Sequence, residues 1–395
     1  MAAKSDVLIV GGGLAGCLTA LKFSAAKPDS PVVLVEEQKT LAGRQTWIFQ
    51  GKDLSPESLE WLMPIVRKSW DEASVQFPRL KRTFEENSAG KYHAVRSEDL
   101  HQAVLDKFGT DVILKSKVIR CTDSQAALEN GKTLVGRTVL DARGFAQEAR
   151  AKLNGFQKYI SIDFRLENAH GLRSPILIDA ICPQLDGYRF FTVIPWDDKH
   201  VTVKETYYSE NPDLNFERIR LSIRSYADRL GWRAASTDRE ESGVMPIPMT
   251  SDYVAPSATG EPLSIGTRGG YFHAMTGDVF LDAVRTAEFL AALVEPTTQT
   301  ARDALMKHRR AWLSRQRFYR LLNRWLFSAV EPSLRYQVIQ HLFELPLDVV
   351  DRLCGGRSTW SDRIRILKSR PPIRLERAFR SLSEKAMQAR LESGH

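Results

Sequence analysis

Five residues near the N-terminus have the spacing of a phosphate-binding turn. Gly11, Gly13 and Gly16 form a G-x-G-x-x-G pattern, with Leu14 and Ala15 between the last two glycines. The first glycine permits a tight turn, the second lets the backbone approach a pyrophosphate, and the third allows close packing of helix on strand. A helix that begins here offers N–H groups and a positive dipole end to phosphates. The pattern therefore predicts a dinucleotide site.

A carboxylate completes this pattern. Glu36 follows Gly16 by twenty positions and closes a second apolar strand, Val32–Val35, while Val7–Val10 forms the strand before the turn. A carboxylate at this place accepts hydrogen bonds from ribose hydroxyls and repels a 2′-phosphate, which disfavours an NADP-type ligand. The strand–turn–helix–strand order makes the pattern far more specific than the glycines alone.

Later segments return the chain to the same site. A strand beginning at Val118 and an apolar strand ending at Asp141 are expected to direct their ends toward the cofactor. A second glycine turn contains Thr276 and Gly277 and leads into a helix from about Asp278. A late strand–turn–helix of this kind commonly closes over the flavin end of FAD, so the sequence favours noncovalent FAD over NAD.

These elements predict an α/β fold: a split Rossmann-like FAD-binding domain, an antiparallel-sheet substrate domain and a C-terminal helical cap. The FAD-binding domain is assigned to residues 1–50, 95–150 and 260–300. Residues 51–94 and 151–259 have period-two alternation and form the substrate domain, crossed by one helix over residues 215–230. Residues 301–395 form the basic, aromatic-rich cap.

Composition limits the class of protein. The chain has 395 residues and scattered cysteines, and it has no apolar run long enough to span a membrane. The sequence shows no signal segment and no metal-binding cluster, so it predicts a cytoplasmic protein with no metal site.

Positive charge is concentrated near the C-terminus. Residues 301–380 hold 18 Lys/Arg and 7 Asp/Glu, although the formal net charge of the whole chain is only +8. No nucleic-acid motif accompanies this charge. Helices with an Arg-rich face suit the anionic inner surface of the cell membrane, and a solvated basic cap is the alternative. If these helices bind the membrane, Arg317, Arg320 and Arg324 are expected to contribute to binding of anionic vesicles.

The chain resembles the bacterial lycopene β-cyclases, a family of flavoproteins that form carotenoid rings. The similarity runs nearly the whole length and rests on distinctive strings: residues 45–49 (QTWIF), 141–145 (DARGF), 170–176 (HGLRSPI), 186–190 (DGYRF), 317–324 (RFYRLLNR) and 362–367 (DRIRIL). The resemblance implies FAD, active in reduced form with NAD(P)H as an electron source. It also implies a hydrophobic polyene substrate and peripheral membrane attachment. The implied reaction is a proton-initiated closure of a linear ψ end group without net redox.

The chain departs from this family where the chemistry is expected. The family has an apolar-Glu-Asp/Glu-Thr strand whose first acid is the proposed proton donor, and here Lys204 occupies that position with Glu205 beside it. Successive strand residues point to opposite faces, so Glu205 cannot simply replace its neighbour. Asp278 follows the second glycine turn, where a helix N-terminus favours the ionised form and therefore a base or cation stabiliser. The candidate catalytic residues are Glu205, Lys204 and Asp278.

Several alternatives stay open from the residues alone. Glu240 and Glu241 are a candidate substitute acid source, although paired acids are usually solvent-exposed, and His273 is more often a structural loop residue than a catalyst. The lysine at the donor position predicts weak or absent activity on lycopene. A flavin-dependent oxidoreductase or hydroxylase on another hydrophobic substrate, or a homologue that lost cyclase activity, remains the alternative function.

Overall fold

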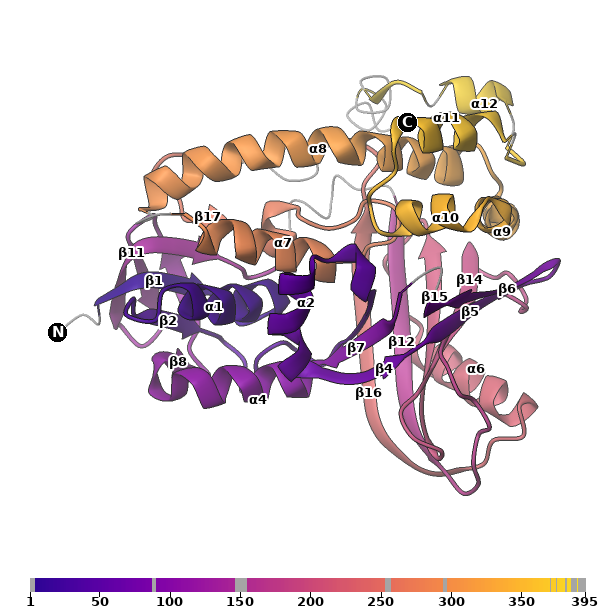
Figure 1. Cartoon of the computed structure of the whole chain (residues 1–395), viewed down its shortest axis with the longest axis horizontal. Helices are drawn as coiled ribbons and strands as arrows, with labels where there is room; N and C mark the ends of the chain where they lie inside the picture. The colour runs from indigo at the N-terminus through magenta and orange to yellow at the C-terminus, as the bar shows by residue number, and fades with distance from the viewer. Residues whose placement is uncertain are drawn as a thin grey trace.

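The computed structural model describes residues 4–86, 90–145, 155–252, 257–293, 297–369, 371–373, 375–380, 382–384 and 389. These residues form two large sheets, a small three-stranded sheet and a layer of helices (Figure 1). The predicted α/β class is confirmed.

The first sheet contains the glycine turn. From edge to edge its strands are β8 (Val112–Ile113), β2 (Val32–Val35), β1 (Lys4–Val10), β11 (Thr133–Asp141), β10 (Gln125–Leu128) and β9 (Val118–Cys121), with β17 (Leu263–Ser264) paired to β11. β1 pairs in parallel with both β2 and β11. Three helices cover one face of this sheet: α1 (Leu14–Ala26), α4 (Ser97–Phe108) and α7 (Phe280–Ala291). The parallel strands are apolar because both faces of the sheet are covered, as the four buried residues of β2 show.

The second sheet is mostly antiparallel. Its order is β16 (Ala234–Ile247), β12 (Gly155–Leu166), β15 (His200–Ser209), β14 (Tyr188–Pro195), β13 (Ile176–Asp179), β5 (Glu72–Phe77) and β6 (Leu80–Glu85). The antiparallel pattern predicted for this region is confirmed except between β13 and β5, which run parallel. Helix α6 (Phe216–Arg229) covers the outer face and matches the helix expected over residues 215–230.

The small sheet connects the two large ones. It consists of β3 (Thr46–Gln50), β7 (Tyr92–Arg96) and β4 (Val66–Trp70). The remaining short elements are α2 (Pro56–Leu62) and the 3-10 turns η1 (Gly51–Asp53), η2 (Met63–Ile65), η3 (Gly109–Asp111), η4 (Gly266–Gly269) and η5 (Pro332–Leu334). The expected domain boundary between residues 150 and 151 lies outside the described residues, and the domain boundaries stay a prediction.

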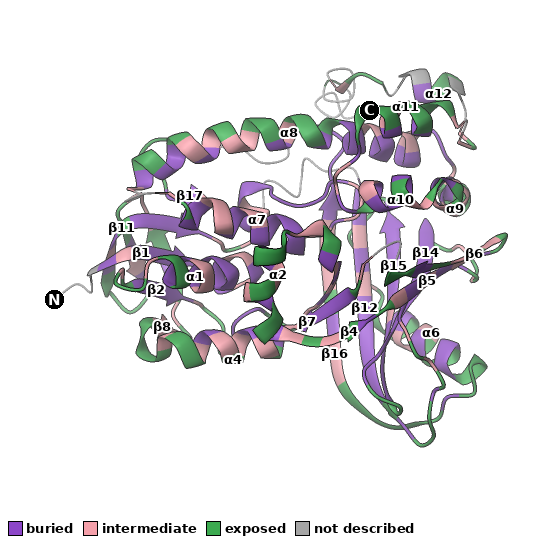
Figure 2. Ribbon diagram, in the orientation of Figure 1, coloured by how far each residue is buried: buried purple, intermediate pink, exposed green. Residues whose placement is uncertain are grey.

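A long helix links the two halves. α8 (Thr298–Ser328) runs over the first sheet and ends above the second, where the shorter C-terminal helices gather (Figure 1). These are α9 (Arg335–Glu344), α10 (Leu347–Cys354), α11 (Trp360–Lys368) and α12 (Leu375–Arg380). Among the described residues, no helix combines the length and the apolar character needed to cross a bilayer. Figure 2 shows buried sheet strands beneath the exposed outer faces of α4, α6 and α8.

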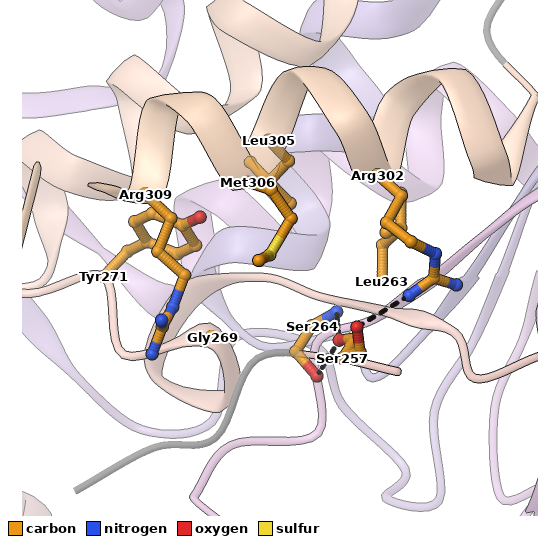
Figure 3. Close-up of a pocket in the computed structure, with 9 residues that line it drawn as sticks. All are labelled: Ser257, Leu263, Ser264, Gly269, Tyr271, Arg302, Leu305, Met306 and Arg309. Atoms are coloured by element: carbon orange, nitrogen blue, oxygen red, sulfur yellow. Dashed lines mark hydrogen bonds between the residues drawn. The ribbon is translucent and has the colours of Figure 1, made fainter. Parts of the chain in front are cut away.

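Several arginines of the basic segment are structural. Arg320 and Arg324 are 3% and 2% exposed, and both contact the Glu384 carboxylate. Arg302 donates to the Ser257 carbonyl at 3.0 Å beside a pocket of about 20 Å³, room for little more than one water (Figure 3). The expectation that Arg320 and Arg324 lie on an exposed basic face was wrong, because they neutralise carbonyl and carboxylate groups inside the cap.

Candidate functional site

A cleft of about 1090 Å³ lies between the carboxyl end of the first sheet and the inner face of the second. Its lining comes from the glycine turn, the end of β2, the segment 142–145 that follows β11, residues of the segment 37–48, and strands β12, β14, β15 and β16. Most of the predicted cofactor residues line it: Gly11, Gly13, Leu14, Ala15, Glu36, Val118, Thr276 and Gly277. The predicted residues Gly16 and Asp141 do not.

The glycine turn has the geometry that a phosphate group needs. Gly11 has φ +103°, and an added Cβ would lie 2.6 Å from the Ala142 carbonyl carbon. A Cβ on Gly13 would meet only the Ala142 oxygen, at 3.9 Å, so this position opens into the cleft. A Cβ on Gly16 would lie 2.1 Å from the Gly11 oxygen, so this glycine serves the packing of α1 against the turn.

Charged side chains border the turn. Glu36 accepts hydrogen bonds from the Gly12 and Gln38 N–H groups at 2.7 and 2.8 Å, which fixes its carboxylate at the cleft wall. Asp141 is buried and holds Arg143 through a 2.7 Å ion pair. Burial alone would raise the pKa of Asp141, but the hydrogen bond and charge of Arg143 hold it below its usual value. Arg143 itself lines the cleft, so Asp141 acts as its anchor.

The loop before α7 forms the opposite wall. Its chain is tied to the second sheet by Gln157, whose side-chain amide donates to the Thr276 carbonyl at 3.0 Å. Gly277 has φ +70°, a conformation that favours glycine. The neutral imidazole of His273 accepts from the Met275 and Thr276 N–H groups and donates to the Leu353 carbonyl. Burial lowers the pKa of His273 to about 4, so this histidine orders the loop in its uncharged form.

Asp278 lies on the cleft wall two residues before α7 begins. Its carboxylate accepts a hydrogen bond from the Phe280 N–H at 3.0 Å. Desolvation nevertheless outweighs this bond and raises the pKa of Asp278 to about 6. The Phe280 N–H favours the ionised form, as expected of a group beside a helix N-terminus, but burial opposes it and has the larger effect on the pKa. The negative charges of Asp282 and Asp53 act in the same direction as burial, so Asp278 can hold a proton up to about pH 6.

The inner face of the second sheet supplies the remaining wall. Trp47 and Ile48 of the small sheet meet a mostly apolar set of side chains here: Tyr159, Leu177, Thr192, Ile194, Val244 and Met245. Lys204 projects into this surface, with its ammonium 5.1 Å from the centre of the Tyr159 ring. Burial lowers the pKa of Lys204, while the charges of Glu241 and Asp278 act in the opposite direction.

Glu205 lies on the other face of β15. It is fully buried, pairs with Arg189 at 2.5 Å and accepts a hydrogen bond from the Tyr207 hydroxyl. These contacts belong to the packing of α6 on the sheet, and the cleft lining does not include Glu205. Neighbouring residues of this strand point to opposite faces, as expected. Glu205 is therefore separated from the other two candidate catalytic residues, Lys204 and Asp278.

The paired glutamates on β16 also diverge. Glu240 points outward to Arg220, whereas Glu241 is 5% exposed and faces the same side as Lys204. Burial raises the pKa of Glu241 to about 7 despite its ion pair with Arg239. The expectation of solvent exposure therefore fails for Glu241, whereas Glu240 is half-buried beside Arg220, because neighbouring residues of a strand point to opposite faces of the sheet.

Sequence reasoning missed several lining residues. Arg143, Gln157 and Tyr159 contribute to the walls without belonging to a recognised cofactor motif. The position of Arg143 directly after the end of an apolar strand was a usable signal. Gln157 and Tyr159 could be placed only once the register of β12 against its neighbours was known.

Comparison with known proteins agrees with the geometry. The family model described as "Lycopene cyclase protein" matches residues 6–380. A lycopene beta-cyclase of Paracoccus sp. (strain N81106 / MBIC 01143) is 34% identical over 97% of this chain and 98% of that protein. The lycopene beta-cyclase of Pantoea ananas is 32% identical over 95% of this chain and 97% of that protein.

Solved structures show the same fold at low identity. A geranylgeranyl bacteriochlorophyll reductase-like protein from Thermoplasma acidophilum aligns with TM-score 0.63 and 14% identity, covering 93% of this chain and 96% of that chain. A probable FAD-dependent monooxygenase from Pseudomonas aeruginosa aligns with TM-score 0.57 and 17% identity, covering 80% of this chain and 96% of that chain. These structures show the fold alone. The family model over residues 6–380 and the relatives at 32–34% identity confirm the resemblance inferred from the residues: the chain belongs to the lycopene cyclase family.

Proposed function

We propose that the chain is an FAD-dependent cyclase that closes a ring at the linear end of a hydrophobic polyene. The Gly11–Gly16 turn and the N-terminus of α1 would hold the pyrophosphate, and Glu36 would accept the ribose hydroxyls. The open space at Gly13 supports this fit, because it lets a phosphate approach the backbone. A cleft of about 1090 Å³ slightly exceeds a typical small-molecule pocket, as a site for a cofactor and a polyene end requires.

The proposed reaction begins with proton transfer from Asp278. Its proton would move to the terminal double bond, the resulting cation would form a carbon–carbon bond to close the ring, and a ring proton would return to the Asp278 carboxylate. Atoms and electrons balance, and no net redox occurs. Reduced FAD, when bound, would supply an electron-rich surface for the cation, with NAD(P)H as the electron source. Lys204 would stabilise the Asp278 carboxylate after it has lost its proton.

One observation carries this proposal: Asp278 and Lys204 face the same cleft as the glycine turn, whereas Glu205 does not. The test is expression in a lycopene-accumulating host, with pigment analysis of wild type, Asp278→Asn and Glu205→Gln. We expect weak ring formation from the wild type and at least about a hundredfold less from Asp278→Asn, the usual scale for a general acid. Loss with Glu205→Gln alone, in a folded protein, would contradict the assignment.

A flavin-dependent oxidoreductase or hydroxylase is the second candidate, because a monooxygenase shares the fold. The two classes differ in their demand for reductant. A cyclase needs NAD(P)H only to reduce the flavin once, whereas a hydroxylase consumes one equivalent for each product. Stoichiometric consumption with product would establish the second candidate.

We further propose peripheral attachment to an anionic membrane surface, on the cytoplasmic side, through α11. Trp360, Ile364 and Leu367 follow i, i+4, i+7 spacing and are 77%, 49% and 40% exposed, so they form one apolar stripe. Arg365 and Lys368 are exposed beside them. An apolar stripe flanked by basic residues matches an anionic bilayer in both polarity and charge.

Vesicle binding tests this attachment. Trp360→Asp should weaken binding to phosphatidylserine-containing vesicles by about ten- to a hundredfold, since burying one large apolar side chain contributes about 1.5–3 kcal/mol. The matched control is Leu221→Asp on α6, which is 64% exposed on another face and should change nothing. Equal effects of the two substitutions would show that α11 is not the contact.

A further inference from the structure

A row of polar side chains crosses the inner face of the second sheet beneath the cleft. Ser161 of β12 lies directly opposite Lys204 of β15 and directly opposite Glu241 of β16. Thr192 of β14 continues the row on the far side of Lys204. Directly opposed residues in antiparallel strands have Cβ atoms about 4.5–5.5 Å apart and share one face. The lysine and the glutamate therefore extend over the same serine from its two sides.

The carboxyl of Glu241 is fixed in place. The Arg239 guanidinium contacts it at 3.0 Å, and the Ser161 hydroxyl hydrogen-bonds to it. Arg239 is itself held by Glu98 at 3.3 Å and contacts the Thr46 hydroxyl at 3.3 Å, and Thr46 lines the cleft. These contacts attach the row to the small sheet and to α4.

The charge of the Lys204 ammonium is favoured electrostatically by two carboxyl groups. Glu241 acts on it from the sheet, and Asp278 acts on it from the loop before α7. Asp163 of β12 also faces Glu241, but its charge is matched by Arg96 of β7. The charged groups that face the row from each packed element are thus Arg239, Asp163, Arg96, Glu98, Lys204 and Asp278.

We propose that Glu241 is a positioning residue of this site: its carboxylate, held by Arg239 and Ser161, keeps Lys204 charged and directed toward Asp278. This proposal rests on the proposed function only because it gives Asp278 the role of the acid. Burial in the wall of the cleft disfavours the charged form of Lys204. The carboxylate of Glu241, two strands away, favours the charged form and offsets this cost. Lys204 then faces Asp278 as a cation, which stabilises the carboxylate that proton transfer would leave.

The direct test is an NMR titration of Lys204 in the full-length protein. Selective carbon-13 labelling at lysine Cε reports the ammonium, and the resonance is assigned by its loss in Lys204→Met. Glu241→Gln should lower the Lys204 midpoint by about one pH unit or more, the usual effect of losing a nearby opposite charge. Glu240→Gln is the matched control, because this neighbour points outward to Arg220, and it should leave the midpoint unchanged.

The reciprocal measurement covers the case in which Glu241→Gln does not fold. Two interacting charges share one coupling free energy, so Lys204→Met should raise the Glu241 carboxyl midpoint by a similar amount. An unchanged Lys204 midpoint in folded Glu241→Gln, or an unchanged Glu241 midpoint in Lys204→Met, would overturn the inference. Neither titration requires turnover, so a protein without cyclase activity would contradict the proposed function and leave this test intact.

Discussion

At the scale of single residues, burial decides the chemistry of the cleft. Asp278 and Glu241 are carboxyls that accept stabilising hydrogen bonds, yet desolvation raises the pKa of both, to about 6 and about 7. Lys204 is shifted in the opposite direction for the same reason. Three groups with perturbed pKa values facing one region are typical of functional sites.

The raised pKa of Asp278 has a consequence for stability. In the folded protein its proton is held up to about pH 6, whereas the unfolded group titrates near its usual 3.8. This contribution to stability is therefore full below pH 4 and is lost as the pH rises through 6. Asp278→Asn should stabilise the protein at pH 8, by about 3 kcal/mol, and change little at pH 4. Urea unfolding at both pH values measures this, and an equal effect at both would be inconsistent with a buried, protonated aspartate.

Gly13 offers a residue-scale test of cofactor binding. Its φ of −71° and the empty space beside it allow a side chain without backbone strain. Gly13→Val should therefore fold with the melting temperature of the flavin-free wild type and lose its bound flavin, because the new methyl groups would occupy the phosphate position. Flavin absorbance of the purified protein decides the outcome, and a yellow Gly13→Val protein would contradict the assignment.

At the scale of elements, the spacing of apolar residues along the chain was enough to predict most of the helices and strands. The strands on either side of the glycine turn, the alternating strands of the second sheet and helix α6 all follow from local pattern. The register between β12, β15 and β16 could not be predicted, because it depends on pairings between distant segments, with Ser161 43 residues from Lys204 and 80 residues from Glu241. That register is what places Glu241 opposite Ser161, and it explains why sequence alone left the acid unassigned.

The loop before α7 supplies an element-scale prediction. A Cβ on Gly277 would lie 2.6 Å from the Gln157 side-chain oxygen, and φ +70° is unfavourable for any other residue. Gly277→Ala should cost about 1–3 kcal/mol and loosen the loop. Adding Gln157→Ala should relieve the clash and leave the backbone strain. Thermal unfolding of the two variants separates these effects, and full recovery in the double variant would show that strain is absent.

At the scale of the whole molecule, the net positive charge serves two purposes. Inward arginines such as Arg320 and Arg324 hold the C-terminal segment at Glu384 against α8, while Arg365 and Lys368 remain outside beside an apolar stripe. Composition alone could not separate these groups, because the helices carry arginines on both faces.

Arg324→Glu should destabilise the fold by about 3–5 kcal/mol, as breaking a buried pair does. Arg365→Glu should leave the melting temperature unchanged and weaken vesicle binding. Denaturation and vesicle sedimentation of both variants test this division, which would fail if Arg365→Glu unfolded the protein.

The central claim is a proton-initiated ring closure without net redox, and solvent isotope incorporation tests it most directly. The purified protein, loaded with reduced FAD, is incubated with lycopene in deuterium oxide, and the product is examined by mass spectrometry. Each ring should gain one deuteron at the protonated carbon and lose one proton, so the product is heavier by one mass unit per ring. NAD(P)H should not be consumed in proportion to product. A product that contains added oxygen or two added hydrogens, formed with stoichiometric use of NAD(P)H, would contradict the account.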